Sequence, residues 1–207
     1  MKNYLEIFKR KKDKIFYKFF ENILKKEFVH IKEYRSDSEN NSGYFGVIKS
    51  FLKNKKKFYS FKRNYFIKSI IETVSKELGA QILEILELRN DGILKKGLQT
   101  SLKLDKLGSP IKHQYPNYLF PLSPTTLRYL KITSDLNFLF GNKFKRVAEI
   151  GCGYGGQALI NDQILNIELA TLFDLPPVNK LINKYLNSHL LNGSFKTTCL
   201  NNEIPED

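Results

Sequence analysis

Apolar and polar residues follow a helical periodicity along much of the first hundred residues. From residue 4 to 32, aromatic and aliphatic side chains recur mostly at spacings of three, four and seven, and lysines cover much of the remaining surface. This pattern predicts one basic amphipathic helix, or two. We expect weaker helical structure at 45–60, a better helix at about 63–78 and a short one at 80–88, followed by a turn at Asn90-Asp91-Gly92.

The second half of the chain alternates short apolar strands with helices. Three prolines between residues 110 and 121 predict an ordered extended loop, and Ser123-Pro124 predicts the start of a helix that ends at Gly141. We then expect strand, helix, strand, helix and strand at 146–150, about 155–165, 169–173, Pro176 to about Leu191, and 194–200. This order is typical of the first half of a doubly wound α/β fold with a parallel sheet.

The positive charge lies almost entirely in the first third of the chain. Residues 1–70 contain 19 basic and 7 acidic residues, whereas residues 71–207 contain 15 and 14. We therefore predict a helical basic region, 1–104, and an α/β region, 105–207. A basic surface can bind nucleic acid, anionic lipid or a phosphorylated substrate, or can simply be solvated. The helix at 4–32 could lie on a membrane surface, although docking of its aromatic stripe on the chain itself is the more common arrangement.

Several classes of protein are disfavoured by composition. No apolar stretch has the length needed to span a bilayer, and lysines interrupt every apolar run near the N-terminus, as a secretory signal would not allow. Cys152 and Cys199 lack the spacing of metal or redox motifs, so we expect free thiols and no metal site. These features predict a cytoplasmic protein, with the inner face of the membrane as a secondary location.

A glycine-rich run between the first predicted strand and its helix is the main candidate site: Glu149-Ile150-Gly151-Cys152-Gly153-Tyr154-Gly155-Gly156-Gln157. Glycine adopts positive φ and lacks a Cβ, so a ligand can lie against the backbone, and the following helix offers free N–H groups. The run satisfies the dinucleotide pattern G-x-G-x-x-G. It also satisfies E-x-G-x-G-x-G, which resembles the first motif of class I S-adenosylmethionine (SAM) methyltransferases.

A second acid supports a nucleoside site. Asp174 follows the second predicted strand, 19 positions after Gly155. Such a carboxylate can accept hydrogen bonds from both ribose hydroxyls, whether the cofactor is NAD or SAM. Glu149 and the mid-chain position of the first strand favour SAM.

Several segments together resemble the sugar O-methyltransferases of bacterial surface-polysaccharide gene clusters. They are Leu107-Gly108-Ser109-Pro110, Leu122-Ser123-Pro124-Thr125-Thr126-Leu127-Arg128-Tyr129, Phe140-Gly141, the glycine-rich run and Phe173-Asp174-Leu175-Pro176. The match covers roughly residues 105–180 and leaves residues 1–100 uncovered. Cys152 stands where another small residue, often glycine, is expected.

The resemblance implies transfer of a methyl group from SAM to a sugar hydroxyl, on a nucleotide-sugar or on a surface glycan such as lipopolysaccharide or capsule. It implies that the cofactor is bound by Glu149, Gly151, Gly153, Tyr154, Gly155, Gln157, Asp174 and Leu175, with Asp174 on the ribose and Leu175 near the adenine. Arg128 and Tyr129 are candidate substrate residues, and His113 is a candidate general base. Structural roles for Arg128 and His113 remain open alternatives.

A class I methyltransferase sheet has about seven strands, whereas three are expected here, so we expect an N-terminal fragment or a truncated or split protein. Three other functions remain open: an RNA or other SAM-dependent methyltransferase, an NAD-binding enzyme, and a non-catalytic remnant that binds a partner. For the favoured function we expect no nucleic-acid partner, and the sequence does not define the oligomeric state.

Overall fold

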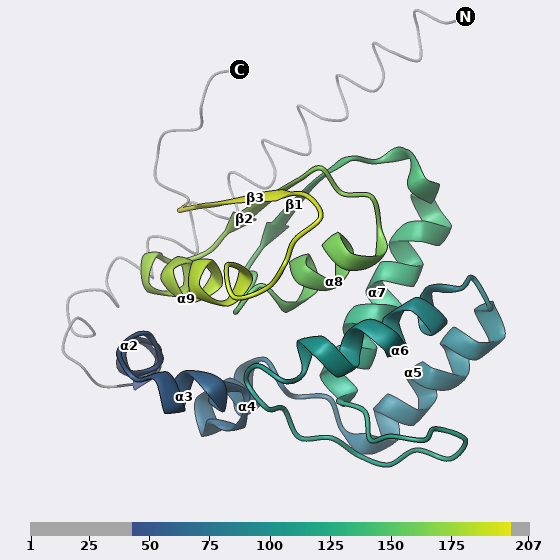
Figure 1. The fold of residues 1–207 in the computed structure, drawn as a ribbon, viewed down its shortest axis with the longest axis horizontal. Helices are drawn as coiled ribbons and strands as arrows, with labels where there is room; N and C mark the ends of the chain where they lie inside the picture. The colour runs from purple at the N-terminus through teal and green to yellow at the C-terminus, as the bar shows by residue number, and fades with distance from the viewer. Residues whose placement is uncertain (1–42, 200–207) are drawn as a thin grey trace, which may run out of the picture. The chain divides into compact units, whose positions relative to one another are not determined.

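The computed structural model describes residues 43–199 and combines helices with a small parallel sheet (Figure 1). The helix predicted at 4–32 lies outside the described residues. The chain divides into two compact units, Met1–Phe45 and Gly46–Asp207, so the boundary predicted between residues 104 and 105 falls inside the second unit. Within residues 43–199, no helix combines the length and the apolar character needed to cross a membrane.

Helices precede the first strand. They are α2 (Gly43–Lys53), α3 (Lys55–Tyr59), the short 3₁₀ helix η1 (Phe61–Arg63), α4 (Tyr65–Ile70), α5 (Lys76–Arg89), α6 (Ile93–Leu104), α7 (Pro124–Phe140) and the 3₁₀ helix η2 (Gly141–Lys143). The predicted bounds of α7 are confirmed, because the Ser123 side chain accepts the first-turn N–H of Thr126 and Gly141 ends the helix. The predicted turn between α5 and α6 is confirmed by left-handed backbone at Asn90 and Gly92.

The single helix predicted at 63–78 is wrong. The chain forms α4 and α5 with residues 71–75 between them. Asn64 caps α4 by accepting the N–H of Phe66, and Ser75 caps α5 by accepting the N–H of Leu78, so each helix has its own start signal. The short helix expected at 80–88 is the last part of α5, and α6 was not predicted.

Three parallel strands form a sheet in the order β1-β2-β3: β1 (Arg146–Ile150), β2 (Leu169–Phe173) and β3 (Ser194–Thr198). Helices α8 (Gly156–Ile164) and α9 (Pro176–Leu186) connect them. The predicted β-α-β-α-β order and the α/β class are confirmed, although the last helix ends at Leu186 and not near Leu191. Its C-terminal turn donates from Asn187, Ser188 and His189 to carbonyls inside the helix.

The sheet is covered by α8 and α9 on one face, and α8 in turn packs against α6 and α7 (Figure 1). Residues Ala170 and Leu172 of the central strand point to this covered face and are buried. Because successive strand residues point to opposite faces, their register partners Val147 and Glu149 of β1 face the same way.

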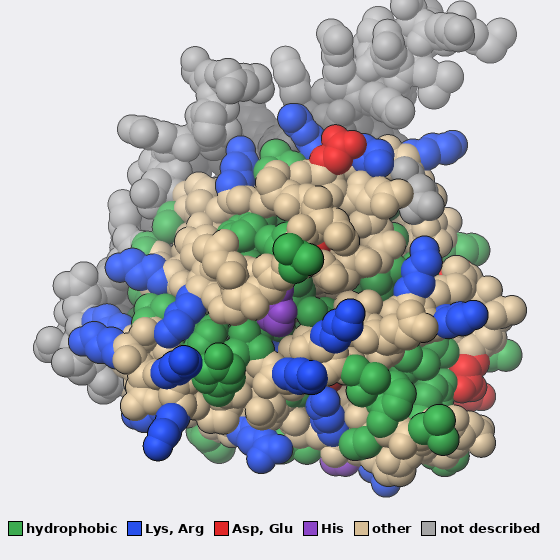
Figure 2. Space-filling model, in the orientation of Figure 1, with side chains coloured by type: hydrophobic (Ala, Val, Ile, Leu, Met, Phe, Trp, Pro, Cys, Tyr) green, Lys and Arg blue, Asp and Glu red, His purple; other side chains and the backbone are tan. Residues whose placement is uncertain are grey.

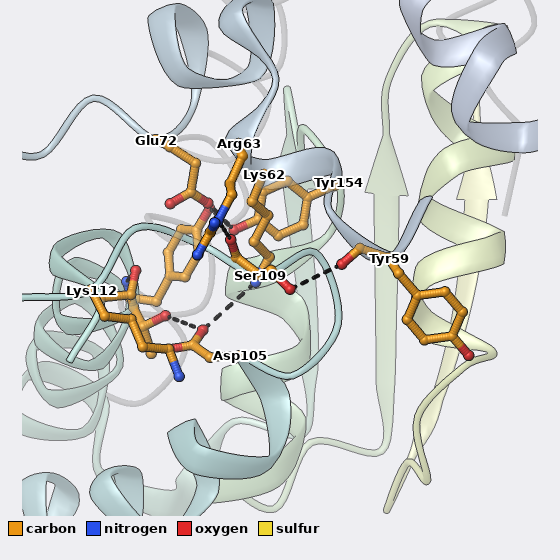
Figure 3. Close-up of polar contacts among 11 residues, drawn as sticks. Tyr59, Lys62, Arg63, Glu72, Asp105, Ser109, Lys112 and Tyr154 are labelled. Carbon is orange, nitrogen blue, oxygen red and sulfur yellow. Dashed lines mark hydrogen bonds and ion pairs between the residues drawn. The ribbon is translucent and has the colours of Figure 1, made fainter. Parts of the chain in front are cut away.

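An aromatic cluster containing Lys62 joins the helical part to the α/β part. Figure 3 shows Lys62 beside Tyr154 and its contact with Asp105. The rings of Phe61, Tyr154 and Tyr185 meet edge-on, with the Tyr154 centroid 5.1 Å from each of the other two. Lys62 places its ammonium 4.9 Å from the Tyr154 ring and 5.4 Å from the Tyr185 ring. Its Nζ also lies 3.7 Å from Asp105, which is buried and accepts a hydrogen bond from Thr126.

The pKa of Lys62 reflects this enclosure. Burial by itself lowers the pKa of the ammonium, but Tyr185 and the carboxylates of Asp105 and Glu72 outweigh that effect and raise it above its ordinary value. Lys62 is therefore a charged lysine inside the protein. We infer that the stability of the fold depends on its buried partner Asp105.

Removal of that partner gives a direct test. We expect Asp105→Ala to lower the free energy of unfolding by about 3–5 kcal/mol, because it leaves the Lys62 charge buried and unpaired. Urea unfolding followed by circular dichroism measures the change. The double variant Lys62→Met/Asp105→Ala should recover much of the loss.

The matched control is Glu168→Ala, which removes the exposed partner of Lys145, 3.8 Å away. Such an exposed pair contributes about 1 kcal/mol or less. Equal losses in Asp105→Ala and Glu168→Ala would contradict the role given to the buried pair.

Candidate cofactor site at the glycine-rich turn

The glycine-rich turn connects β1 to α8 and depends on positive φ angles. Gly151, Gly153 and Gly155 have φ of 73°, 58° and 85°. The turn is closed by two backbone hydrogen bonds of 2.9 Å, from Gly151 to the carbonyl of Phe173 and from Gly155 to that of Cys152. A Cβ added at Gly151 would meet no heavy atom within 4 Å, so open space lies beside this residue. The first glycine is therefore the part of the turn that a ligand can approach most closely.

Asp174 lies beside the turn, at the end of β2. One carboxylate oxygen accepts the N–H of Gly153 at 3.0 Å and the other accepts the N–H of Leu175 at 2.8 Å. Burial raises the pKa of Asp174, while the backbone hydrogen bonds from Leu175 and Gly153 act in the opposite direction. The structure thus brings together the turn and the acid that the sequence singled out 19 positions further along. Leu175 itself is half-buried at the N-cap of α9.

Glu149 provides a second carboxyl group near Asp174. It lies on the covered face of β1, and among the described residues no hydrogen bond or ion pair reaches its carboxylate. Burial, together with the charge of Asp174, raises the pKa of Glu149 to about 7. Two acids with raised pKa values therefore lie at the carboxyl edge of a parallel sheet, where they can bond to a hydroxyl-bearing ligand or pair with a cationic one.

Cys152 fills the interior of the turn. Its thiol donates to the carbonyl of Glu149 at 3.0 Å, and burial raises the pKa of the thiol well above its ordinary range. Cys152 is therefore a neutral, buried thiol that packs as a small residue.

The side chain of Tyr154 points away from the turn and into the protein (Figure 3). It is 1% exposed, and its hydroxyl donates to Glu72 at 2.6 Å. Any contact between Tyr154 and a cofactor must therefore come from its backbone. Gln157 is also turned inward, because its amide donates to the Tyr129 carbonyl, Thr133 and Asn161 and fixes α8 against α7.

The two predicted substrate residues lie on the helical side of the turn. Tyr129 is buried, and its ring is close enough to Gly156 that a Cβ there would lie 2.6 Å from it. The Arg128 guanidinium donates to the carbonyl of Ile71 at 3.1 Å and lies 5.2 Å from the ring of Tyr129. In this arrangement Arg128 holds the connection between α4 and α5.

His113, the predicted base, lies in the loop before α7. There it forms an antiparallel bridge with Leu122. Among the described residues, no hydrogen bond or ion pair connects His113 with the glycine-rich turn or with Asp174.

Two further residues at the turn were missed at the sequence level. Ile71 places its terminal methyl 2.8 Å from the position of a Cβ on Gly153, and Glu72 accepts the hydroxyl of Tyr154. Both come from residues 71–75, which were predicted as helix. The available signal was Ser75, a good N-cap residue that marks the start of α5, but it was hidden by the apparent helical periodicity.

A cavity of about 480 Å³ lies elsewhere, between α5, α6 and the loop before α7. Its lining includes Leu86, Leu98, Leu102 and Phe120, and none of the predicted site residues. Within residues 43–199, no group of three or more His, Cys, Asp and Glu side chains could hold a metal ion.

The chain matches no protein-family model, no curated protein and no solved structure. A functional assignment therefore depends on the residues and the geometry of the turn.

The raised pKa of Glu149 predicts a pH dependence of stability. In the unfolded chain this group ionises near 4.5 and in the folded protein near 7, so the folded state holds the proton more tightly between these values. The free energy of unfolding should fall as pH rises through this window, by about 3 kcal/mol in total. Glu149→Gln should flatten this part of the profile and should be the more stable protein above pH 7.

Urea unfolding of both proteins between pH 4.5 and 8 tests this expectation. The exposed acid Glu168 provides the control, and Glu168→Gln should leave the wild-type profile unchanged. Parallel profiles for wild type and Glu149→Gln would show that the carboxyl group ionises normally.

Proposed function

We propose that the glycine-rich turn binds SAM and that the chain is part of a methyltransferase that acts on a sugar hydroxyl, either of a nucleotide-sugar or of a surface glycan. The observation that carries the proposal is the hydrogen bond from Gly153 to Asp174 beside the open space at Gly151. It supports a nucleoside site because a positive-φ turn, a helix N-terminus and an acid on the next strand meet at one edge of the sheet.

The hydrogen-bonding groups at the turn suit SAM. A carboxylate has about four lone-pair positions, and Asp174 uses two of them on backbone N–H groups, which leaves acceptors for ribose hydroxyls. Glu149 is available for a cationic amino group, whose charge would offset the cost of ionising a buried acid. A Cβ at Gly151 would meet no heavy atom within 4 Å, so a ligand has room against the backbone there.

Bound SAM would supply a methyl group made electrophilic by its sulfonium. The contribution of this chain is alignment, because an in-line displacement needs the acceptor oxygen, the carbon and the sulfur in one row. The turn is suited to this task because Asp174 holds it at Gly153 and the Tyr154 ring anchors it in the aromatic cluster. The sugar acceptor rests on the resemblance of the segment Leu122–Tyr129, which builds the start of α7.

NAD is the competing cofactor, and one observation favours keeping it in the test. Gly156 completes the dinucleotide pattern, and a Cβ there would lie within 2.7 Å of Tyr154 and Tyr129. Close packing of the helix is the role of the third glycine in that pattern. The same packing is compatible with SAM.

Isothermal titration calorimetry with SAM, and with NAD as comparison, tests the proposal on the wild-type chain. We expect SAM to bind and Gly151→Ala to abolish or strongly weaken binding, because its Cβ occupies the space at the turn. The control is Gly92→Ala. Gly92 has a φ of 79° and, like Gly151, nothing within 4 Å, so the backbone strain is matched while the site is untouched. Equal loss in the two variants would mean that strain alone explains the effect.

Asp174 allows a separate prediction. Asp174→Ala should weaken SAM binding about a hundredfold, since two charge-assisted hydrogen bonds contribute about 1.5 kcal/mol or more each. Asp174→Asn keeps one acceptor and should lose less. Thermal unfolding in the absence of ligand separates this loss from any loosening of the turn. Binding of NAD but not SAM, or unchanged SAM affinity in Asp174→Ala, would reject the proposed site.

A further inference from the structure

Residues 46–71 contain no acidic residue and eight basic ones. They form most of α2, then α3, η1 and α4, and the next acid along the chain is Glu72. The proposed cofactor site uses none of the exposed basic side chains of this segment. Their charge therefore needs a separate explanation.

Six of the eight basic side chains are exposed: Lys53, Lys55, Lys56, Lys57, Arg63 and Lys68. Of the other two, Lys62 is buried, as described above, and Lys49 is half-buried. In the part of the chain that the structure describes, none of the six forms an ion pair with an acid, and Arg63 donates only to the carbonyl of Ser109. Figure 2 shows Lys and Arg side chains over α2, α3 and α4 with no Asp or Glu among them.

The same segment also exposes large apolar side chains. Tyr59, Tyr65 and Ile70 are 51%, 77% and 55% exposed. Their direction is set by neighbours that point inward, since Phe58, Phe61 and Ile67 are buried in the core. A helix or turn that fixes one set of residues inward must present the others outward.

We propose that α3, η1 and α4 form a basic surface that binds an anionic lipid bilayer. Lysine heads attract negatively charged headgroups, while tyrosine rings and an aliphatic side chain enter the interfacial region. A solvated basic surface would have no need for Tyr65 and Ile70 to be exposed among the lysines.

Nucleic acid is the other polyanion that such a surface could bind, and two features favour lipid. Five of the six exposed basic side chains are lysines, which act as point charges, whereas recognition of phosphate groups in nucleic acid favours the bidentate fork of arginine. Ile70 offers an aliphatic side chain that suits acyl chains and cannot stack on bases.

The test is co-sedimentation of the full chain with vesicles of phosphatidylcholine alone and with vesicles that also contain phosphatidylglycerol. The wild type should bind only the anionic vesicles, and high salt should release it. The triple variant Lys55→Glu/Lys56→Glu/Lys57→Glu should bind at least about tenfold more weakly, as the loss of several favourable lysine contacts implies. Tyr65→Ser/Ile70→Ser should weaken binding and leave its salt dependence in place.

The matched control is Lys95→Glu/Lys96→Glu/Lys103→Glu. It makes the same change in net charge with three exposed lysines of α6, outside the basic surface. It should keep wild-type binding. Thermal unfolding of each variant confirms that the fold is retained.

Three results would overturn the proposal. They are retained binding in the triple variant of α3, equal loss in the two triple variants, and the absence of wild-type binding to anionic vesicles. Tighter binding to single-stranded RNA than to anionic vesicles, lost in the α3 variant, would assign the surface to nucleic acid instead. None of these results depends on SAM, so the proposal and the proposed function can fail separately.

Discussion

The burial of Tyr154 is the interaction on which the rest of the structure depends. A turn rich in glycine has little side-chain mass of its own and loses much backbone entropy on folding. Tyr154 supplies the missing anchor, because its ring packs against Phe61 and Tyr185 and its hydroxyl bonds to Glu72. One residue of the turn thereby fixes the turn to the helices that precede the sheet and to α9, which follows β2.

The other contacts of the turn follow from this anchor. With Tyr154 held inside, Gly153 lies between Asp174 of the sheet and Ile71 of the helical part. A Cβ added at Gly155 would lie 3.2–3.5 Å from side-chain atoms of Ile182 and Leu186 of α9. Gly155 and Gly156 are required for different reasons. Gly155 needs a φ of 85°, whereas Gly156 lacks room for any side chain beside Tyr129. This explains why two glycine patterns overlap in one turn.

Lysine has two opposite roles in residues 46–71, the segment without acidic residues. Lys62 is enclosed by the rings of Tyr154 and Tyr185 and paired with Asp105, so its charge is part of the core. A few residues away, Lys55, Lys56 and Lys57 are exposed and have no acidic partner among the described residues. The composition alone does not separate these roles, because the distinction depends on which side of a short helix each residue occupies.

The sequence by itself determined the order of strands and helices from Pro124 to Thr198. It also located the glycine-rich turn between β1 and α8. Local signals suffice there: Ser123-Pro124 starts α7, Gly141 ends it, and the apolar strands stand out from their surroundings. Only the tertiary structure decided that Tyr154 and Gln157 point inward, and that Ile71 and Glu72 meet the turn. Tyr154 and Glu72 are 82 positions apart in the sequence, and Gln157 bonds to α7 residues 24 and 28 positions before it. Neither periodicity nor spacing along the chain encodes such contacts, because they arise when the helical part packs against the sheet.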